Sequence, residues 1–259
     1  MMSNDYTYKK YRELLEAIKN RGYKCYTLKE WIEETPETGI VMRHDVDRYP
    51  KNSLHIAFVE KELEIKSTYY FRANKCSFNH EIIKEISSMG HEIGYHYEDL
   101  SDANGDHNKA IDLFKDNLNR LREISEVRTI SMHGRPMSKF DNRDLWKKYN
   151  ILDYELTGEA YLTINYKDIY YFSDTGRTWN DNGINIRDKV ATSLKMKLSN
   201  TDSLISFINH NSQLKIAILT HPERWNDNKY LWYKYYLRDL MSNNSKRIVQ
   251  FARKNIKNN

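Results

Sequence analysis

The sequence contains few of the residues that interrupt or crosslink a chain. Its 259 residues include nine glycines, four prolines and two cysteines. The low glycine and proline content excludes collagen-like and low-complexity chains. Cys25 and Cys76 form no CxxC pair, so we expect two reduced thiols, although one disulfide is arithmetically possible. No linker rich in proline, glycine or serine divides the chain, and we expect a single domain over residues 1–259.

Long apolar runs and a strong excess of one charge are also missing. The longest apolar runs, such as residues 216–219, fall far short of the ~20 residues that a membrane span needs. No apolar segment typical of a signal peptide follows the first residues, so we expect a cytoplasmic protein without a membrane span. The 41 basic and 36 acidic residues give a net charge of +5 without a dense basic stripe, and we expect no nucleic-acid partner.

The chain does contain alternating helical and extended patterns, with 20 Tyr, 8 Phe and 5 Trp available for a core. Such alternation favours a parallel α/β sheet or barrel. The helices that we expect cover residues 6–21, 28–33, 53–65, 80–89, 107–124, 201–210 and 227–257. The strands that we expect cover residues 39–45, 67–71, 91–96, 127–133, 151–155, 169–173 and 214–220.

Several of these strands end in ionisable residues. Asp45 and Asp47 close the first strand, and positions two apart in an extended backbone point to the same side. Two such carboxylates could hold a cation, or one of them could act as a base. They could equally cap the next helix or pair with Arg43 and Arg48. Because active sites gather at the carboxyl ends of strands in α/β proteins, we expect a site at this edge.

Three histidines also follow expected strands. His96 is a candidate metal ligand, since neutral imidazole commonly binds zinc, and strand alternation places His91 on the opposite face. His133 could be a ligand, an orienting group or part of a turn. His221 follows an apolar strand, and its pKa near neutrality suits a general acid. The aromatic residues near these positions could form core or a platform for a sugar ring.

Together these segments resemble the polysaccharide deacetylase superfamily, carbohydrate esterase family 4. Residues 43–47 (RHDVD) resemble its first motif, residues 90–96 (GHEIGYH) its second and residues 219–221 (LTH) its last. The resemblance implies a distorted (β/α) barrel with flanking helices at about residues 6–34 and 227–257. It also implies a metal-dependent hydrolase that removes an N- or O-acetyl group from a sugar.

The resemblance also assigns roles. It implies that Asp45 is the general base, that Asp47 and His96 bind the metal and that His221 is the general acid. Arg135 would orient Asp45. Because Val46 separates two aspartates that are adjacent in the family, the base and ligand roles of Asp45 and Asp47 could be exchanged.

The family's usual third ligand is missing, because Leu100 stands at its position. We assign His133 as the replacement, with Glu98 and Asp99 as alternatives. Asp174 is a candidate partner for His221. The candidate substrate contacts are Tyr97, Arg177, Trp179 and Trp225.

Two histidines with one carboxylate favour Zn²⁺ among the divalent metals. The expected substrate is a sugar, or a nucleotide-linked or lipid-linked sugar from surface polysaccharide biosynthesis. One alternative is a carbohydrate-binding protein whose deacetylase site has decayed. Another is a glycosyltransferase with Asp45-Val46-Asp47 as its DxD motif, which the short preceding segment and the missing glycine-rich phosphate loop disfavour.

Overall fold

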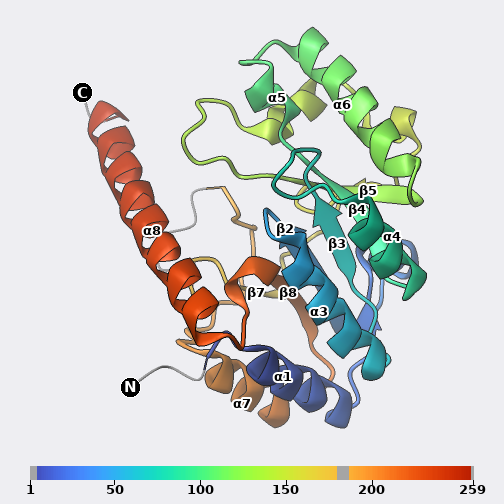
Figure 1. Ribbon diagram of the computed structural model, residues 1–259, viewed down its shortest axis with the longest axis vertical. Helices are drawn as coiled ribbons and strands as arrows, with labels where there is room; N and C mark the ends of the chain where they lie inside the picture. The colour runs from blue at the N-terminus through green and yellow to red at the C-terminus, as the bar shows by residue number, and fades with distance from the viewer. Residues whose placement is uncertain (1–4, 180–186, 258–259) are drawn as a thin grey trace.

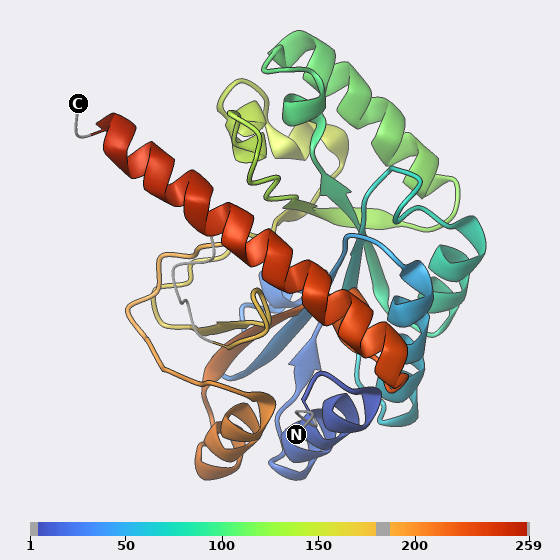
Figure 2. The ribbon, with the colours of Figure 1, turned by 60° about the vertical axis from the view of Figure 1, so that its left-hand side comes forward.

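The computed structural model describes residues 5–179 and 187–257. Its strands form one sheet in which every pairing is parallel, in the order β6-β5-β4-β3-β2-β8-β7, with β1 paired to β2. The sheet is curled, and helices flank it on the outside (Figures 1 and 2). Within the described residues β6 and β7 are the open edges. The expected distorted barrel is therefore confirmed in an open form.

Most of the longer helices and strands follow one another along the chain as the alternating pattern predicts, whereas β1, α5 and the three 3-10 helices were not predicted. The strands are β1 (Cys25–Tyr26), β2 (Gly39–Val46), β3 (Thr68–Phe71), β4 (Glu92–Tyr97), β5 (Val127–Met132), β6 (Gly158–Glu159), β7 (Tyr170–Ser173) and β8 (Lys215–Thr220). The α-helices are α1 (Tyr8–Asn20), α2 (Leu28–Glu34), α3 (Pro50–Glu62), α4 (His80–Ser88), α5 (Asp99–Asp102), α6 (His107–Arg122), α7 (Thr201–His210) and α8 (Lys229–Lys257). Three short 3-10 helices are η1 (Asn142–Lys147), η2 (Ile151–Tyr154) and η3 (Pro222–Arg224).

The central strand β2 is buried along its whole length and carries the site into the middle of the sheet. Its neighbours are β3 on one side and β8 on the other, so that Asp45 pairs with Tyr70 and His44 pairs with Thr220. In the same sheet His96 of β4 pairs with Ser131 of β5. Parallel registers bring the carboxyl ends of these strands to one edge, as the sequence analysis expects.

Helix α1 shows how the sequence sets the ends and the buried face of a helix. The Thr7 side chain accepts a hydrogen bond from the Lys10 backbone N–H and caps the first turn. Tyr11, Leu14 and Ile18 recur at helical spacing, and all three are buried against the core. The cap and the apolar face agree, which explains why the prediction for residues 6–21 holds closely.

One predicted strand is wrong. Residues 151–155 contain the 3-10 helix η2, and the strand of this region is the two-residue β6, which begins at Gly158. The Asn150 side chain accepts a hydrogen bond from the Leu152 backbone N–H, which starts the helical turn. The Leu152 side chain is exposed, so its hydrophobicity does not mark a buried strand.

The last helix, α8, differs from the others in length and position. It lies across one face of the molecule, and its far end extends away from the sheet (Figure 2). Trp232 and Tyr235 near its beginning are buried, whereas Tyr230 and Tyr233 are exposed. Over the described residues, no helix combines the length and apolar character that a membrane crossing needs.

Candidate active site

A cavity of about 210 Å³ opens at the carboxyl edge of β2, β4, β5 and β8. Its lining includes the five ionisable residues that the sequence places at strand ends. They are Asp45, Asp47, His96, His133 and His221. The carboxyl ends of these strands therefore meet at one cavity, as predicted, although the residues are far apart in the chain.

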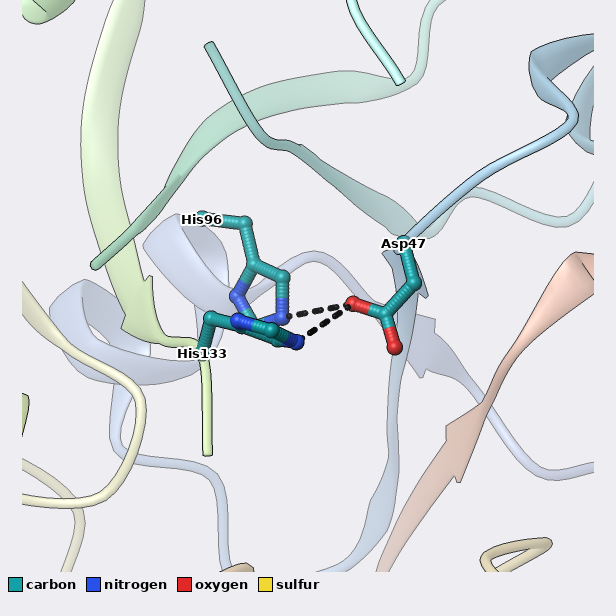
Figure 3. Close-up of side chains that lie close together, drawn as sticks. All are labelled: Asp47, His96 and His133. Carbon is teal, nitrogen blue, oxygen red and sulfur yellow. Dashed lines mark ion pairs between the residues drawn. The ribbon is translucent and has the colours of Figure 1, made fainter. Parts of the chain in front are cut away.

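Three of these side chains converge on one point. The Oδ1 atom of Asp47 lies 3.4 Å from Nε2 of His96 and 3.4 Å from Nε2 of His133 (Figure 3). The ligand atoms of the three side chains all lie within 4.8 Å of one another. One carboxylate and two imidazoles in this arrangement match the donors of catalytic zinc sites.

Hydrogen bonds orient both imidazoles. Nδ1 of His96 lies 2.9 Å from the Ser131 backbone carbonyl, and a carbonyl can only accept, so this nitrogen carries the proton. Nδ1 of His133 lies 2.9 Å from Oε2 of Glu98. Each ring therefore turns Nε2 towards Asp47 and, in its neutral form, offers the lone pair of Nε2 to a cation there, as in metal-binding histidines whose other nitrogen is held by a carbonyl or a carboxylate.

The two rival ligands take other positions. Glu98 holds His133 and also accepts hydrogen bonds from Arg72, so it supports a ligand from behind. The Asp99 carboxylate turns towards the Tyr95 hydroxyl and the Asn117 amide, at 2.9 and 2.8 Å. Burial raises the pKa of Asp99 to about 7. Of the three candidates, His133 alone joins Asp47 and His96.

The carboxylates are also incompletely satisfied. Oδ1 of Asp47 and Oδ1 of Asp45 are both buried without a hydrogen-bond partner. An unsatisfied buried acceptor costs free energy, and a bound cation removes that cost. Although burial favours the neutral carboxyl, His133 and His96 hold the pKa of Asp47 well below its ordinary value. These residues therefore fit a divalent metal.

Asp45 sits beside this group and has a different cationic neighbour. Its Oδ2 lies 3.7 Å from Nε2 of His96, and its Oδ1 lies 3.7 Å from Nη1 of Arg43. Arg43 is buried and fixed by a 2.6 Å hydrogen bond to Ser131 Oγ and by the Tyr161 ring below it. Of the two aspartates, only Asp47 lies within ion-pair distance of both His96 and His133, so the two carboxylates have different surroundings.

The expectation that Arg135 orients Asp45 is wrong in this structure. Arg135 pairs with Asp102, and its Nη1 lies 3.7 Å from Oε2 of Glu98. Arg43 occupies the position next to Asp45 because it precedes Asp45 by two residues on the same face of β2. Strand alternation was the signal that could have identified it.

On the other side of the cavity, Asp174 holds His221. Asp174 Oδ1 lies 2.7 Å from Nδ1 of His221, and Oδ2 accepts the His221 backbone N–H at 2.9 Å. Arg224 and the Trp225 indole donate to the same carboxylate, at 2.6 and 3.0 Å. Burial opposes its charge, but Arg224 and His221 bring the pKa of Asp174 to about 2.

His221 is consequently held with a defined tautomer. Its Nδ1–H points to Asp174, which leaves Nε2 for the cavity that His221 lines. Burial and Arg224 lower the pKa of His221, but Asp174 outweighs them, so the pKa is raised above its ordinary value. The arrangement suits a group that donates a proton near neutral pH.

Glu223 is a cavity residue that the sequence analysis missed. Its Oε2 is buried without a hydrogen-bond partner, and its Oε1 lies 3.8 Å from Nε of Arg48. Burial and the nearby charge of Asp47 raise the pKa of Glu223 to about 7. Its position in η3, two residues after His221, could have identified it from the sequence.

None of the four predicted substrate contacts lines the cavity. Tyr97, Trp179 and Trp225 are fully buried in the core and do not line the cavity. The indole N–H groups are used internally, by Thr201 for Trp179 and by Asp174 for Trp225. Arg177 is also absent from the cavity lining, because Asp239 pairs with its guanidinium at 2.7 Å.

Several solved structures are similar in fold to this chain. No family model and no curated protein matches the sequence. A Streptococcus mutans CE4 esterase is 13% identical with a TM-score of 0.46, and the match covers 92% of this chain and 91% of that one. Bacillus subtilis PdaA, a family 4 carbohydrate esterase, is 15% identical with a TM-score of 0.38, covering 80% and 86%.

A third neighbour is a CE4 family pseudoenzyme from Bacillus anthracis, 12% identical with a TM-score of 0.45. The match covers 78% of this chain and 60% of the pseudoenzyme. A separate match to a mutant of that pseudoenzyme with restored enzymatic activity covers 62% of the mutant chain. The structure resembles members of carbohydrate esterase family 4.

Proposed function

We propose that the protein is a metal-dependent hydrolase that removes an acetyl group from a sugar or sugar conjugate. The observation that carries this proposal is the convergence of Asp47, His96 and His133, with each imidazole presenting Nε2 to the cavity. Asp45 lies beside this group, and His221 lines the same cavity.

In this proposal Asp47, His96 and His133 hold the metal, and Zn²⁺ fits their donor atoms best. A bound divalent ion would lower the pKa of a water molecule and polarise the acyl carbonyl. Asp45 accepts the proton of the attacking water, and Arg43, 3.7 Å from its Oδ1, holds the carboxylate in place.

His221 donates the second proton. Its Nε2 gives a proton to the departing amine or alkoxide, and Asp174 stabilises the imidazolium before the transfer. A base and an acid on separate strands allow one group to accept a proton while the other releases one.

We also propose that the substrate is a single sugar or a nucleotide-linked or lipid-linked sugar from surface polysaccharide biosynthesis. The cavity of about 210 Å³ is consistent with one sugar residue at the reacting end. A cytoplasmic location remains a prediction from the sequence.

The deciding experiment measures bound metal and acetate release together. We expect near-stoichiometric metal in the wild type, and reduced metal and hydrolysis of acetylated sugars in both His96→Ala and His133→Ala. His80→Ala is the matched control, because His80 is exposed at the start of α4. Metal retained in His133→Ala would reject the ligand assignment, and a metal-loaded wild type without hydrolysis would favour a decayed, carbohydrate-binding site.

A further inference from the structure

The outer part of the cavity is built by two segments that are far apart in the chain. Arg48 and Tyr49 come from the turn between β2 and α3, and Tyr235 and Arg238 come from α8. We call these four residues the cavity mouth. The Tyr49 and Tyr235 rings stack at 4.9 Å, and Nη1 of Arg238 donates to the Tyr49 hydroxyl at 3.1 Å. The mouth is therefore a connected structure.

Tyr49 adopts a backbone conformation that is unfavourable for a bulky residue. Its φ is 52° and its ψ is 60°, in the left-handed region, and its side chain does not cap α3. Backbone strain of this kind persists where the surrounding structure enforces it, often beside a ligand site. Here the Tyr49 ring packs against Tyr235 of α8, next to Arg48 in the chain.

The four arginines that line the cavity differ in their partners. Arg135 is paired with Asp102, and Arg224 is paired with Asp174. The arginines of the mouth have longer or uncharged partners: Arg48 forms a 3.8 Å ion pair with Glu223, and Arg238 donates to the hydroxyl of Tyr49. Asp239, the nearest acidic residue on α8, is committed to Arg177.

We propose that the cavity mouth binds a phosphate group of the substrate, so that the preferred substrate is an acetylated sugar carrying a phosphate ester. This inference rests on the proposed function and names its substrate class. Two planar guanidinium groups at one opening suit phosphate oxygens, with which arginine forms paired, charge-assisted hydrogen bonds. A phosphate at the mouth places the attached sugar in the inner cavity, towards Asp47 and His221.

The same phosphate chemistry occurs in a sugar 1-phosphate, in a nucleoside diphosphate sugar and in a lipid diphosphate sugar. These sources are separated by comparing one N-acetylated hexosamine as the free sugar, the 1-phosphate, the nucleoside diphosphate ester and a short-chain lipid diphosphate ester. An N-acetylated hexuronic acid tests whether a carboxylate serves equally. The charged form with the highest kcat/KM identifies the source.

The test compares the wild type with Arg48→Gln, Arg238→Gln and the double variant. We expect the ratio of kcat/KM for a phosphorylated sugar to kcat/KM for the free sugar to fall about tenfold for each substitution, as for a lost charge-assisted hydrogen bond. Lys234→Gln removes an exposed positive charge from α8 outside the cavity and should leave the ratio unchanged. An equal ratio in the wild type and the double variant, or an equal loss with the hexuronic acid, would overturn the proposal.

A binding measurement separates this inference from the proposed function. Calorimetric titration with inorganic pyrophosphate, at equal metal loading, should show binding to the wild type and to Lys234→Gln and a loss of about tenfold or more in the double variant. If no sugar is hydrolysed but this difference in pyrophosphate affinity is found, the hydrolase proposal fails and phosphate binding at the cavity mouth is supported. Equal pyrophosphate affinity in all forms would reject the mouth even if hydrolysis is observed.

Discussion

At the scale of single residues, the two histidines of the site are held by unlike partners. His96 donates to a backbone carbonyl, whereas His133 interacts with the Glu98 carboxylate. A substitution can remove the second partner but not the first. The His133 side of the site is therefore the one where outer contacts can be tested.

We expect Glu98→Gln to weaken metal affinity by about 10- to 100-fold, the usual effect of removing a partner that orients a metal ligand. The reason is that a neutral amide cannot supply the negative charge that orients and polarises His133. Competition with a chromophoric chelator measures the change. Asp102→Asn is the control, since it removes a nearby carboxylate that contacts Arg135 but not His133. Unchanged affinity in Glu98→Gln would contradict the assigned role.

The pairing of His221 with Asp174 makes a prediction about pH. His221 must be protonated to act as an acid, so activity should fall as the pH rises through its raised pKa. In Asp174→Asn the raising effect is lost while burial and Arg224 still lower the pKa, so the alkaline limb should move to lower pH. The pH profile of kcat/KM tests this, with circular dichroism to verify folding. An alkaline limb at the same pH as in the wild type would exclude His221 as the acid.

At the scale of elements, β4 depends on a glycine that the second motif contains. A Cβ atom at Gly94 would lie 2.2 Å from the Tyr70 ring and 3.0 Å from the Thr129 carbonyl. The Tyr70 ring is fully buried and its hydroxyl contacts Thr129 Oγ1 at 2.9 Å, so it has little room to move. The motif therefore preserves the close packing of β3 and β4 next to His96.

We expect Gly94→Ala to lower the free energy of unfolding by about 1–3 kcal/mol, the usual cost of overpacking a core. Urea denaturation measures the loss. Gly90→Ala provides a comparison, because its added Cβ would meet nothing within 4 Å and only its positive φ of 92° opposes the change. A Gly94→Ala variant as stable as the wild type would show that β3 and β4 can separate at this point.

Sequence patterns predicted much at this scale. Helical spacing and apolar runs located most helices and strands, because each of these elements buries one continuous face. The strand-end argument then placed Asp47, His96, His133 and His221 around one cavity. The prediction of a strand at 151–155 failed because Ile151 and Leu152 are apolar but neither is buried.

The rest of the site depends on tertiary packing that no local pattern encodes. Trp179 and Trp225 are residues of a type that often stacks against sugar rings, but here α1, α7 and the core cover them. Residues of α8 line the cavity only because that helix crosses one face of the molecule, and the sequence does not indicate this position (Figure 2). Arg43 and Arg135 are both plausible partners for Asp45 in sequence, and only the fold distinguishes them.

At the scale of the whole molecule, a buried carboxylate links several elements. Glu60 of α3 accepts hydrogen bonds from Tyr11 of α1 and Tyr69 of β3, at 2.6 and 2.5 Å, and from Ser67 at 2.6 Å. It also lies 2.8 Å from Nε2 of His44 on β2. Burial alone would favour its neutral form, but His44 and the other partners bring the pKa of Glu60 to about 2.

This pKa predicts a specific acid sensitivity. An unfolded chain takes up the Glu60 proton near the ordinary value of 4.5, whereas the folded chain resists until about 2. The stabilisation is complete above the ordinary value and is lost as the pH falls through the folded value. Urea denaturation between about pH 5 and pH 3 should show stability decreasing, with a smaller slope for Glu60→Gln. Parallel curves for both proteins would exclude Glu60 as the source.

Metal binding should also stabilise the molecule as a whole. A ligand that binds only the folded state at 100 times its Kd contributes about 2.7 kcal/mol, or roughly 5–10 °C in Tm for a chain of this size. We expect Zn²⁺ to produce such a rise in the wild type and little rise in Asp47→Asn, because the carboxylate ligand is lost. Differential scanning calorimetry with and without chelator measures it. An equal rise in both proteins would place the metal elsewhere.

The position of β2 at the centre of the sheet has a consequence for folding. The metal-binding half of the site comes from β2, β4 and β5, which are joined through neighbours close in the chain. The acid comes from β8, which pairs with β2 across most of the chain length, and such distant pairings form slowly. We expect a folding intermediate with β2 to β5 assembled to capture metal before it can turn over substrate. During refolding, metal uptake should therefore precede the return of activity. The delay between the two measures how long β8 takes to pair with β2.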